Sequence, residues 1–215
     1  MARPHLSRPA GTDHRPVIVD LSAHRMRIRM RDALAVYVAA MGYPRGTEQH
    51  RGPMWLEHIG RRGWQAVGAL QPDSTGRCDP DTAPLLAVGY GYHGLPQQWW
   101  YQQVDEGMRR AGWRELDIRA VLGDYFELTE LHVHPAAQGR GLGQAMAVRL
   151  LGCRPESSVL LSTPEIESED NRAWRLYRRL GFGDVVRRFG FAGDSRPFAV
   201  LGRSLPLDNP PADRW

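Results

Sequence analysis

The chain has 215 residues, of which 42% are hydrophobic, and its formal net charge is +4. This length and composition are typical of a single globular domain with its own core. No segment approaches the roughly 18 consecutive apolar residues of a membrane helix, and the first residues lack the apolar stretch of a signal peptide. We therefore expect a cytoplasmic protein without membrane contact.

All 28 basic residues are arginine, because the sequence contains no lysine. We attribute this to a coding bias toward arginine rather than to a nucleic-acid surface, since no basic block with interleaved aromatic residues stands out. A modest positive field would in any case attract an anionic ligand. Cys78 and Cys153 lie far apart without CxxC spacing and are expected to be reduced thiols.

The first half of the chain is predicted to alternate between helices and strands, after a disordered segment over residues 1–15. Hydrophobic periodicity predicts a strand at 17–21, a helix at about 26–41, a short helix at about 53–61 and two strands at 64–70 and 84–92. Between the last two strands, residues 71–83 are polar and contain Pro/Asp turn signals, so we expect a loop there.

Residues 95–124 form an insertion between two predicted strands. Residues 97–111 have helical composition, with one apolar stripe that consists of Trp100, Val104, Met108 and Ala111. A connection of this length inside a compact domain usually carries function. Three interpretations stay open: a helical lid over a binding site, ordinary packing, and a dimer contact through the aromatic run 99–101.

The second half is predicted to contain a strand at 125–134, a helix at 142–152, a strand at about 159–163, a helix that begins near Asp170 or Asn171, and strands at 185–191 and 198–204. The Pro-rich residues 206–215 are expected to be loose. The prediction is therefore one domain over residues 16–205 with a tail at each end.

The most informative segment is residues 131–146, LHVHPAAQGRGLGQAM. Alternating Leu131 and Val133 suit a strand, Pro135 ends it, and the glycines allow a tight turn before a helix. The unpaired amides and positive dipole end of that helix would face an anion such as a pyrophosphate. The spacing matches neither the P-loop, which needs a lysine, nor GxGxxG.

Two motifs in this half resemble the signatures of the GCN5-related N-acetyltransferases. The first, Q-x-x-G-x-G, is filled by Gln138, Gly141 and Gly143. The second, N-x-x-A-x-x-L-Y-x-x-x-G-F, is similar to residues 170–182, with one departure: Asp170 stands where the family has asparagine, and Asn171 follows one place late. Either residue could cap the helix, so the contacts usually made by that asparagine are in doubt.

The resemblance implies an α/β (α+β) fold: a mixed, mostly antiparallel sheet of six or seven strands flanked by four helices. In the family, two neighbouring parallel strands splay apart and admit the acyl-pantetheine arm of the cofactor, acetyl-CoA. The resemblance places coenzyme A along the strand and the loop, and near the start of the second motif. The residues concerned are Leu131, His132, Val133, Gln138, Gly139, Arg140, Gly141, Leu142, Gly143, Gln144, Asp170 and Asn171.

Amide formation needs an unprotonated amine, and a general base lowers that barrier. Glu127 occupies the position of a catalytic glutamate in many family members, and we prefer it to Glu130. Because side chains alternate along a strand, only one of the two should face the cleft unless a bulge intervenes. His132 and His134 are weaker candidates. A solvated or ion-paired carboxylate remains the alternative for both glutamates.

Tyr177 matches the family tyrosine that protonates the leaving thiolate, with core packing as its alternative role. The backbone N–H of Val133 is the natural donor to the thioester carbonyl. The histidine spacing makes no metal set. The resemblance thus implies an N-acetyltransferase that transfers acetyl from acetyl-CoA to an amine, in a small molecule or a protein, by direct attack. A non-catalytic acyl-CoA sensor and a nucleic-acid-binding protein are the alternatives, and a homodimer is possible.

Overall fold

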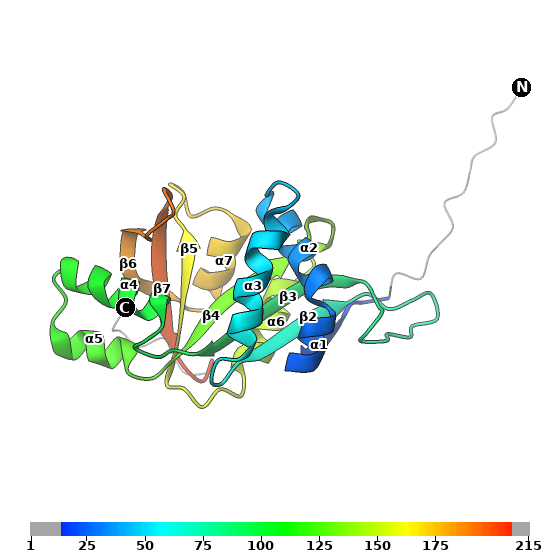
Figure 1. The fold of residues 1–215 in the computed structure, drawn as a ribbon, viewed down its shortest axis with the longest axis horizontal. Coiled ribbons are helices and arrows are strands. Elements are labelled where there is room, and N and C mark those ends of the chain that lie inside the picture. Colours follow the sequence, from blue (N-terminus) through cyan, green and yellow to red (C-terminus); the bar gives the residue numbers. More distant parts are fainter. Residues whose placement is uncertain (1–13, 208–215) are drawn as a thin grey trace, which may run out of the picture.

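A computed structural model describes residues 14–207, so the predictions for residues 1–13 and 208–215 lie outside the described part. Its centre is a seven-stranded sheet in the order β1-β2-β3-β4-β5-β7-β6 (Figure 1). Only β4 and β5 pair in parallel, and the other neighbours are antiparallel. The strands are β1 (Val17–Leu21), β2 (Gln65–Leu70), β3 (Leu85–His93), β4 (Tyr125–Val133), β5 (Ser158–Pro164), β6 (Gly183–Gly190) and β7 (Pro197–Ser204). The predicted mixed sheet is confirmed.

Helices are more numerous than the four expected. The described residues contain α1 (Ala23–Ile28), α2 (Met30–Met41), α3 (Thr47–Ile59), α4 (Trp99–Arg110), α5 (Glu115–Leu122), α6 (Leu142–Leu151) and α7 (Arg172–Arg179), with a short 3-10 turn at Pro135–Ala137. Within this range, no helix is both long and apolar enough to cross a membrane.

Two helix boundaries correct the prediction. The single helix expected over 26–41 is broken at Arg29, whose backbone leaves the helical region and whose buried guanidinium donates to the carbonyls of Pro80 and Ala83 at 2.8 and 2.7 Å. The helix expected from Pro53 begins at Thr47 instead. Proline suits a first helical position, but here it lies inside the helix, so it was a misleading start signal.

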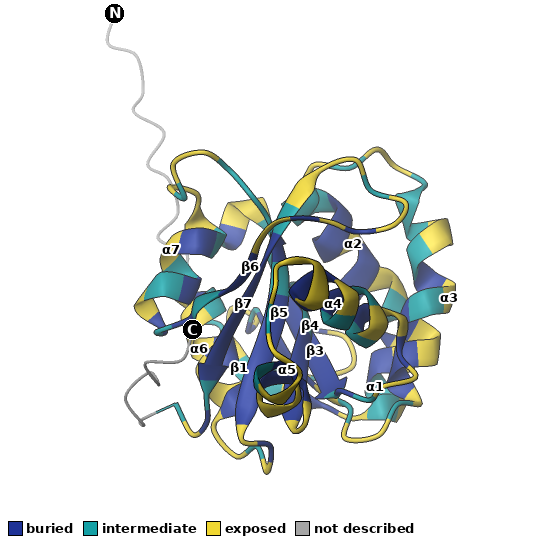
Figure 2. Cartoon of the chain, turned by 90° about the vertical axis from the view of Figure 1, so that its left-hand side faces the viewer, coloured by how far each residue is buried: buried dark blue, intermediate teal, exposed yellow. Residues whose placement is uncertain are grey.

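The two faces of the sheet carry three apolar cores. Helices α6 and α7 pack on one face, and α1, α2 and α3 cover the β1–β4 part of the other (Figure 1). The remaining part of that second face, over β5, β7 and β6, is covered by α4 and α5. Figure 2 shows the dark buried strands between these partly exposed helices.

The insertion contains two helices where one was expected. Trp100, Val104 and Met108 of the predicted stripe are buried, while Ala111 is exposed. Ile118 and Leu122 of α5 complete the same core. The indole Nε1 of Trp100 also donates to Oγ of Ser162 on β5 at 3.2 Å. These contacts favour ordinary packing as the role of the buried stripe.

Candidate active site

The predicted strand, glycine turn and helix follow one another in the structure. Strand β4 ends at Val133, and α6 begins after Gly141, whose backbone is left-handed with φ of 76°. Gly139 has φ of 80°, a conformation that is strained for other residues. Within residues 14–207, the amides of Gly139, Gly141, Leu142 and Gly143 donate to no acceptor. The turn therefore presents a row of free N–H groups at a helix N-terminus.

Gly143 serves packing rather than turn geometry. A Cβ atom at this position would lie 3.1 Å from Cδ2 of Leu176, where α6 packs against α7. Gly139 and Gly141 have open space around that position, so their need for glycine comes from backbone conformation. The glycines of the motif thus have different physical roles.

Two glutamines flank the free amides. Nε2 of Gln138 donates to the carbonyl of Val133 at 3.0 Å, which ties the turn to the end of the strand. The Oε1 atom of Gln138 accepts from Arg172, and that of Gln144 accepts from Arg179 at 3.2 Å. The two sequence motifs are therefore in direct contact.

Strands β4 and β5 separate after a short parallel ladder. They pair at Tyr125–Ser158, Phe126–Val159 and Glu127–Leu160, and pairing stops there although both strands continue. On the other edge of β4, the N–H of His134 donates to Leu86 at 2.8 Å. Because N–H directions alternate along a strand, the N–H of Val133 points into the gap. The structure thus contains the splayed strands that the resemblance implied.

A bulge in β4 brings both candidate glutamates to one face. Tyr90 pairs with Glu130 and Gly91 with Leu128, so Thr129 has no partner in β3. The extra residue restores the alternation, and Glu127 and Glu130 both face the α2–α3 side of the sheet. The exception foreseen for an intervening bulge therefore holds, and orientation alone does not choose between the two carboxylates.

Glu127 is buried, with 3% of its surface exposed. Its Oε1 accepts from the hydroxyl of Tyr92 at 2.9 Å, while Oε2 is buried and has no hydrogen-bond partner among the described residues. Burial raises the pKa of Glu127 to about 7, against the opposing hydrogen bond from Tyr92. The carboxylate is poised to exchange a proton near neutral pH.

Glu130 is also buried, and both of its carboxylate oxygens have partners. Its Oε1 accepts from Nε1 of Trp55 at 3.2 Å, and its Oε2 pairs with Nε2 of His132. Burial alone would raise the pKa of Glu130, but the hydrogen bond with His132 and the charge of Arg51 hold it below its ordinary value. This carboxylate stays ionised.

Tyr177 lies on α7 and is 8% exposed. Its ring meets Phe182 edge-on at 5.7 Å between centroids, and its hydroxyl has no hydrogen-bond partner among residues 14–207. Burial, and then the charge of Glu130, raise the pKa of Tyr177 to about 12. The phenol therefore remains a proton donor throughout the physiological pH range.

Comparisons with known proteins identify the family. Residues 77–182 match the model of the acetyltransferase (GNAT) family. A GCN5-like protein acetyltransferase of Mycobacterium tuberculosis is 57% identical over 202 residues, which cover 88% of this chain and 98% of that protein. The chain belongs to the GNAT acetyltransferase family.

Solved GNAT structures share the fold. The ribosomal-protein-S18-alanine N-acetyltransferase of Escherichia coli has a TM-score of 0.55 at 14% identity, over 90% of this chain and 96% of that one. A phosphinothricin acetyltransferase of Sinorhizobium meliloti, solved in complex with AcCoA, has a TM-score of 0.50 at 17% identity, over 92% and 94%. At these identities the likeness concerns the GNAT fold alone.

The departure in the second GNAT motif has a local explanation. Oδ1 of Asn171 accepts from the N–H of Trp174 at 2.9 Å and caps α7, while Asp170 is exposed outside the helix. Of the two predicted cap candidates, Asn171 is the one used. His134 is likewise occupied locally, because its Nδ1 accepts from the N–H of Ala136 at 3.3 Å.

Sequence reasoning missed the residues that support Glu127. The Tyr92 hydroxyl, which contacts the carboxylate, accepts from Nη1 of Arg61 at 2.6 Å, and Arg61 pairs with Glu57 at 3.0 Å near the surface. The alternation Tyr90-Gly91-Tyr92 on a strand was the available signal, since it places two hydroxyls on one face. The bulge sets Tyr90 opposite Glu130 and Tyr92 opposite Glu127 across the strands; the Tyr92 hydroxyl reaches its glutamate, whereas the Tyr90 hydroxyl contacts His58.

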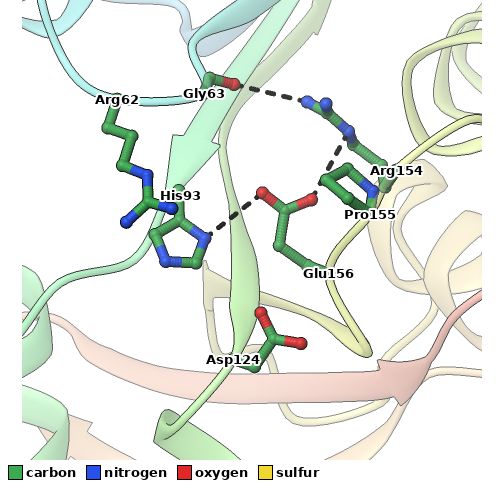
Figure 3. Close-up of a pocket in the computed structure, with 7 residues that line it drawn as sticks. All are labelled: Arg62, Gly63, His93, Asp124, Arg154, Pro155 and Glu156. Carbon is green, nitrogen blue, oxygen red and sulfur yellow. Dashed lines mark hydrogen bonds and ion pairs between the residues drawn. The ribbon is translucent and has the colours of Figure 1, made fainter.

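A separate cavity of about 260 Å³ lies where β4 begins, away from the glycine turn (Figure 3). Glu156 points into it and pairs with Nδ1 of His93 at 3.3 Å and with Nε of Arg154 at 3.5 Å. Arg154 also donates to the carbonyl of Gly63 at 3.3 Å. These contacts link β3 to the segments that precede β2 and β5, so we interpret the cluster as a structural one that holds these segments together.

Proposed function

We propose that this GNAT protein transfers the acetyl group of acetyl-CoA to a primary amine of another protein by direct attack. The 57% identical relative, which is named a protein acetyltransferase, supports a protein acceptor. The observation that carries the chemistry is Glu127, a buried carboxylate with a pKa of about 7 near the point where β4 and β5 separate.

The glycine turn fits coenzyme A. Free N–H groups at residues 139, 141, 142 and 143 and the positive end of α6 suit a pyrophosphate. Acetyl-CoA would supply the activated thioester. In the gap between β4 and β5, the N–H of Val133 is directed so that it can donate to a carbonyl oxygen there.

Glu127 would accept the proton of the amine, directly or through water. A lysine-like amine has a pKa near 10.4, so exposing its lone pair at neutral pH costs roughly 4–5 kcal/mol. A base with a pKa near the working pH combines a substantial ionised fraction with a useful proton affinity. Glu130 stays ionised and is held by Trp55 and His132, so it is the weaker candidate for this role.

Tyr177 would protonate the departing thiolate. It is buried on α7, where the neighbouring Leu176 packs against Gly143 of α6, and it keeps its proton because its pKa is raised to about 12. A donor that remains protonated at all working pH values suits a step in which negative charge develops on sulfur.

The test is thiol release from acetyl-CoA with a panel of acceptors: free amines, peptides with one lysine, peptides with a free N-terminus, and folded lysine-containing proteins. We expect turnover with protein or peptide amines and little with free amines. Turnover with free amines alone would overturn the protein acceptor. Tight acetyl-CoA binding without thiol release from any acceptor would favour the non-catalytic sensor.

A further inference from the structure

Helix α7 carries arginines in two different environments. Arg178 is paired with two carboxylates, Glu169 at 2.9 Å and Asp184 at 2.6 Å. Arg172, Arg175 and Arg179 are exposed, and within residues 14–207 none of them has a carboxylate within 4.0 Å. One side of the helix is therefore neutralised, and the other keeps three positive charges.

The three uncompensated arginines lie beside the glycine turn. Arg172 donates to Gln138 and Arg179 to Gln144, the two glutamines that flank the free amides. Residues at positions 172, 175 and 179 recur every three or four places, so they share one face of the helix. Arg175 lies between the other two, and its guanidinium forms no hydrogen bond or ion pair with the described residues.

We propose that Arg172, Arg175 and Arg179 form a second phosphate site, which takes the 3′-phosphate of coenzyme A. The proposal deepens the proposed function, because the glycine turn must first hold the pyrophosphate. Coenzyme A carries a phosphate monoester on its ribose in addition to that pyrophosphate, and the monoester is close to a dianion at neutral pH. Helix amides offer only partial charges, whereas guanidinium groups offer full charges in a fork that fits phosphate oxygens.

This site would decide which donors the enzyme accepts. Thioesters of free coenzyme A carry the 3′-phosphate. Thioesters on a protein-bound phosphopantetheine carry the same reactive arm but lack both the adenosine and this phosphate. Arginines that bind the phosphate would therefore favour free coenzyme A thioesters as donors.

The experiment measures the affinities of coenzyme A and 3′-dephospho-coenzyme A by calorimetry. We expect the unmodified protein to prefer coenzyme A by about tenfold or more, the gain typical of a charge-assisted hydrogen bond. The variant Arg172→Gln/Arg175→Gln/Arg179→Gln should lose this preference while retaining its affinity for the dephospho compound. Arg175→Gln alone, which removes no side-chain hydrogen bond or ion pair within the described residues, should lose part of this preference.

The matched control is Arg110→Gln/Arg114→Gln/Arg119→Gln, which removes the same charge from exposed side chains of the insertion (68%, 80% and 72% exposed). It should keep the preference. Equal affinity of the unmodified protein for both compounds would overturn the proposal. So would an equal loss for both in the α7 variant, because the arginines would then serve the pyrophosphate. If neither compound binds, the proposed function itself fails at the glycine turn.

Discussion

Glu127 and Glu130 lie on one strand, face the same side of the sheet and are both buried, yet they differ in charge state. Glu127 has a single side-chain partner from another strand, Tyr92, and a pKa of about 7. Glu130 contacts Trp55 and His132, and its pKa is lowered. Burial is common to both, so the kind and placement of the partners decide which carboxylate can exchange a proton: both oxygens of Glu130 are paired, one of them with His132, whereas Oε2 of Glu127 has no hydrogen-bond partner among the described residues.

The largest expected effect comes from Glu127→Gln. Loss of the base should lower kcat by about 10³ at pH 7, within the range for general-base catalysis. The deficit should shrink as the pH approaches the pKa of the acceptor amine, because the amine then deprotonates without help. A kcat profile against pH measures this, with Glu106→Gln, an exposed carboxylate of α4, as control. A deficit that is constant with pH would show that Glu127 is not the base.

Tyr177→Phe should affect protonation of the leaving thiolate rather than deprotonation of the amine. The ring packing against Phe182 is kept and only the donor is lost, so kcat should fall by about 10² at every pH, with little change in acetyl-CoA affinity. Parallel pH profiles for this variant and the unmodified protein would separate its role from that of Glu127. An unchanged kcat would leave Tyr177 with a packing role alone.

Tyr92→Phe should widen the difference in pKa between Glu127 and Glu130. The hydroxyl stabilises the ionised carboxylate, so its loss should raise the pKa of Glu127 by about one unit and lower the rate at pH 7 about fivefold. The rate should recover above pH 8. Tyr90→Phe is the matched control, because that hydroxyl contacts His58 rather than Glu127. A loss that does not recover at high pH would contradict a role through the carboxylate.

Glu130→Gln should have the smallest effect on rate. The charge of Glu130 raises the pKa of Glu127, so its removal should shift the acidic limb of the pH profile slightly toward lower pH and leave the plateau nearly unchanged. If this variant instead loses as much activity as Glu127→Gln, the assignment of the base is reversed.

The stabilities of Glu127→Gln and Glu130→Gln should depend on pH in opposite directions. The pKa of Glu127 is raised in the folded state, so the unmodified protein loses stability as the pH rises from about 4.5 to 7. Glu127→Gln has no carboxyl to titrate, so its stability relative to the unmodified protein should increase over that interval. The pKa of Glu130 is lowered, so its contribution is present above about 4.5 and lost in acid, and the Glu130→Gln deficit should shrink there. Melting temperatures should differ by about 2–4 °C for each 1 kcal/mol. Parallel trends would contradict the assigned pKa directions.

The sequence predicted the sheet and the glycine turn because both depend on local patterns. Alternating apolar residues mark each strand, and Gly139 and Gly141 satisfy a backbone requirement that operates within a few residues. The family resemblance then placed Glu127 and Tyr177 on the elements where the structure has them.

What the sequence could not predict depends on contacts between distant segments. The bulge at Thr129 is visible only in the register with β3, and it alone brings Glu130 to the face of Glu127. The break at Arg29 follows from carbonyls at Pro80 and Ala83, far along the chain. The uneven compensation of the α7 arginines likewise requires the positions of Glu169 and Asp184.

The short ladder between β4 and β5 has a mechanical consequence. Three residue pairs join β1–β4 to β5, β7 and β6, whereas β5 and β7 are joined along seven. This seam is the weakest line across the sheet, and we expect amide hydrogen exchange to be fastest along it in the free protein. Beyond Glu127 and Leu160, β4 and β5 are not paired. A pantetheine arm that accepted a hydrogen bond from the N–H of Val133 would take the place of the absent strand there. Bound acetyl-CoA would thus bridge the two parts of the sheet, and its binding would slow the separation of β4 from β5.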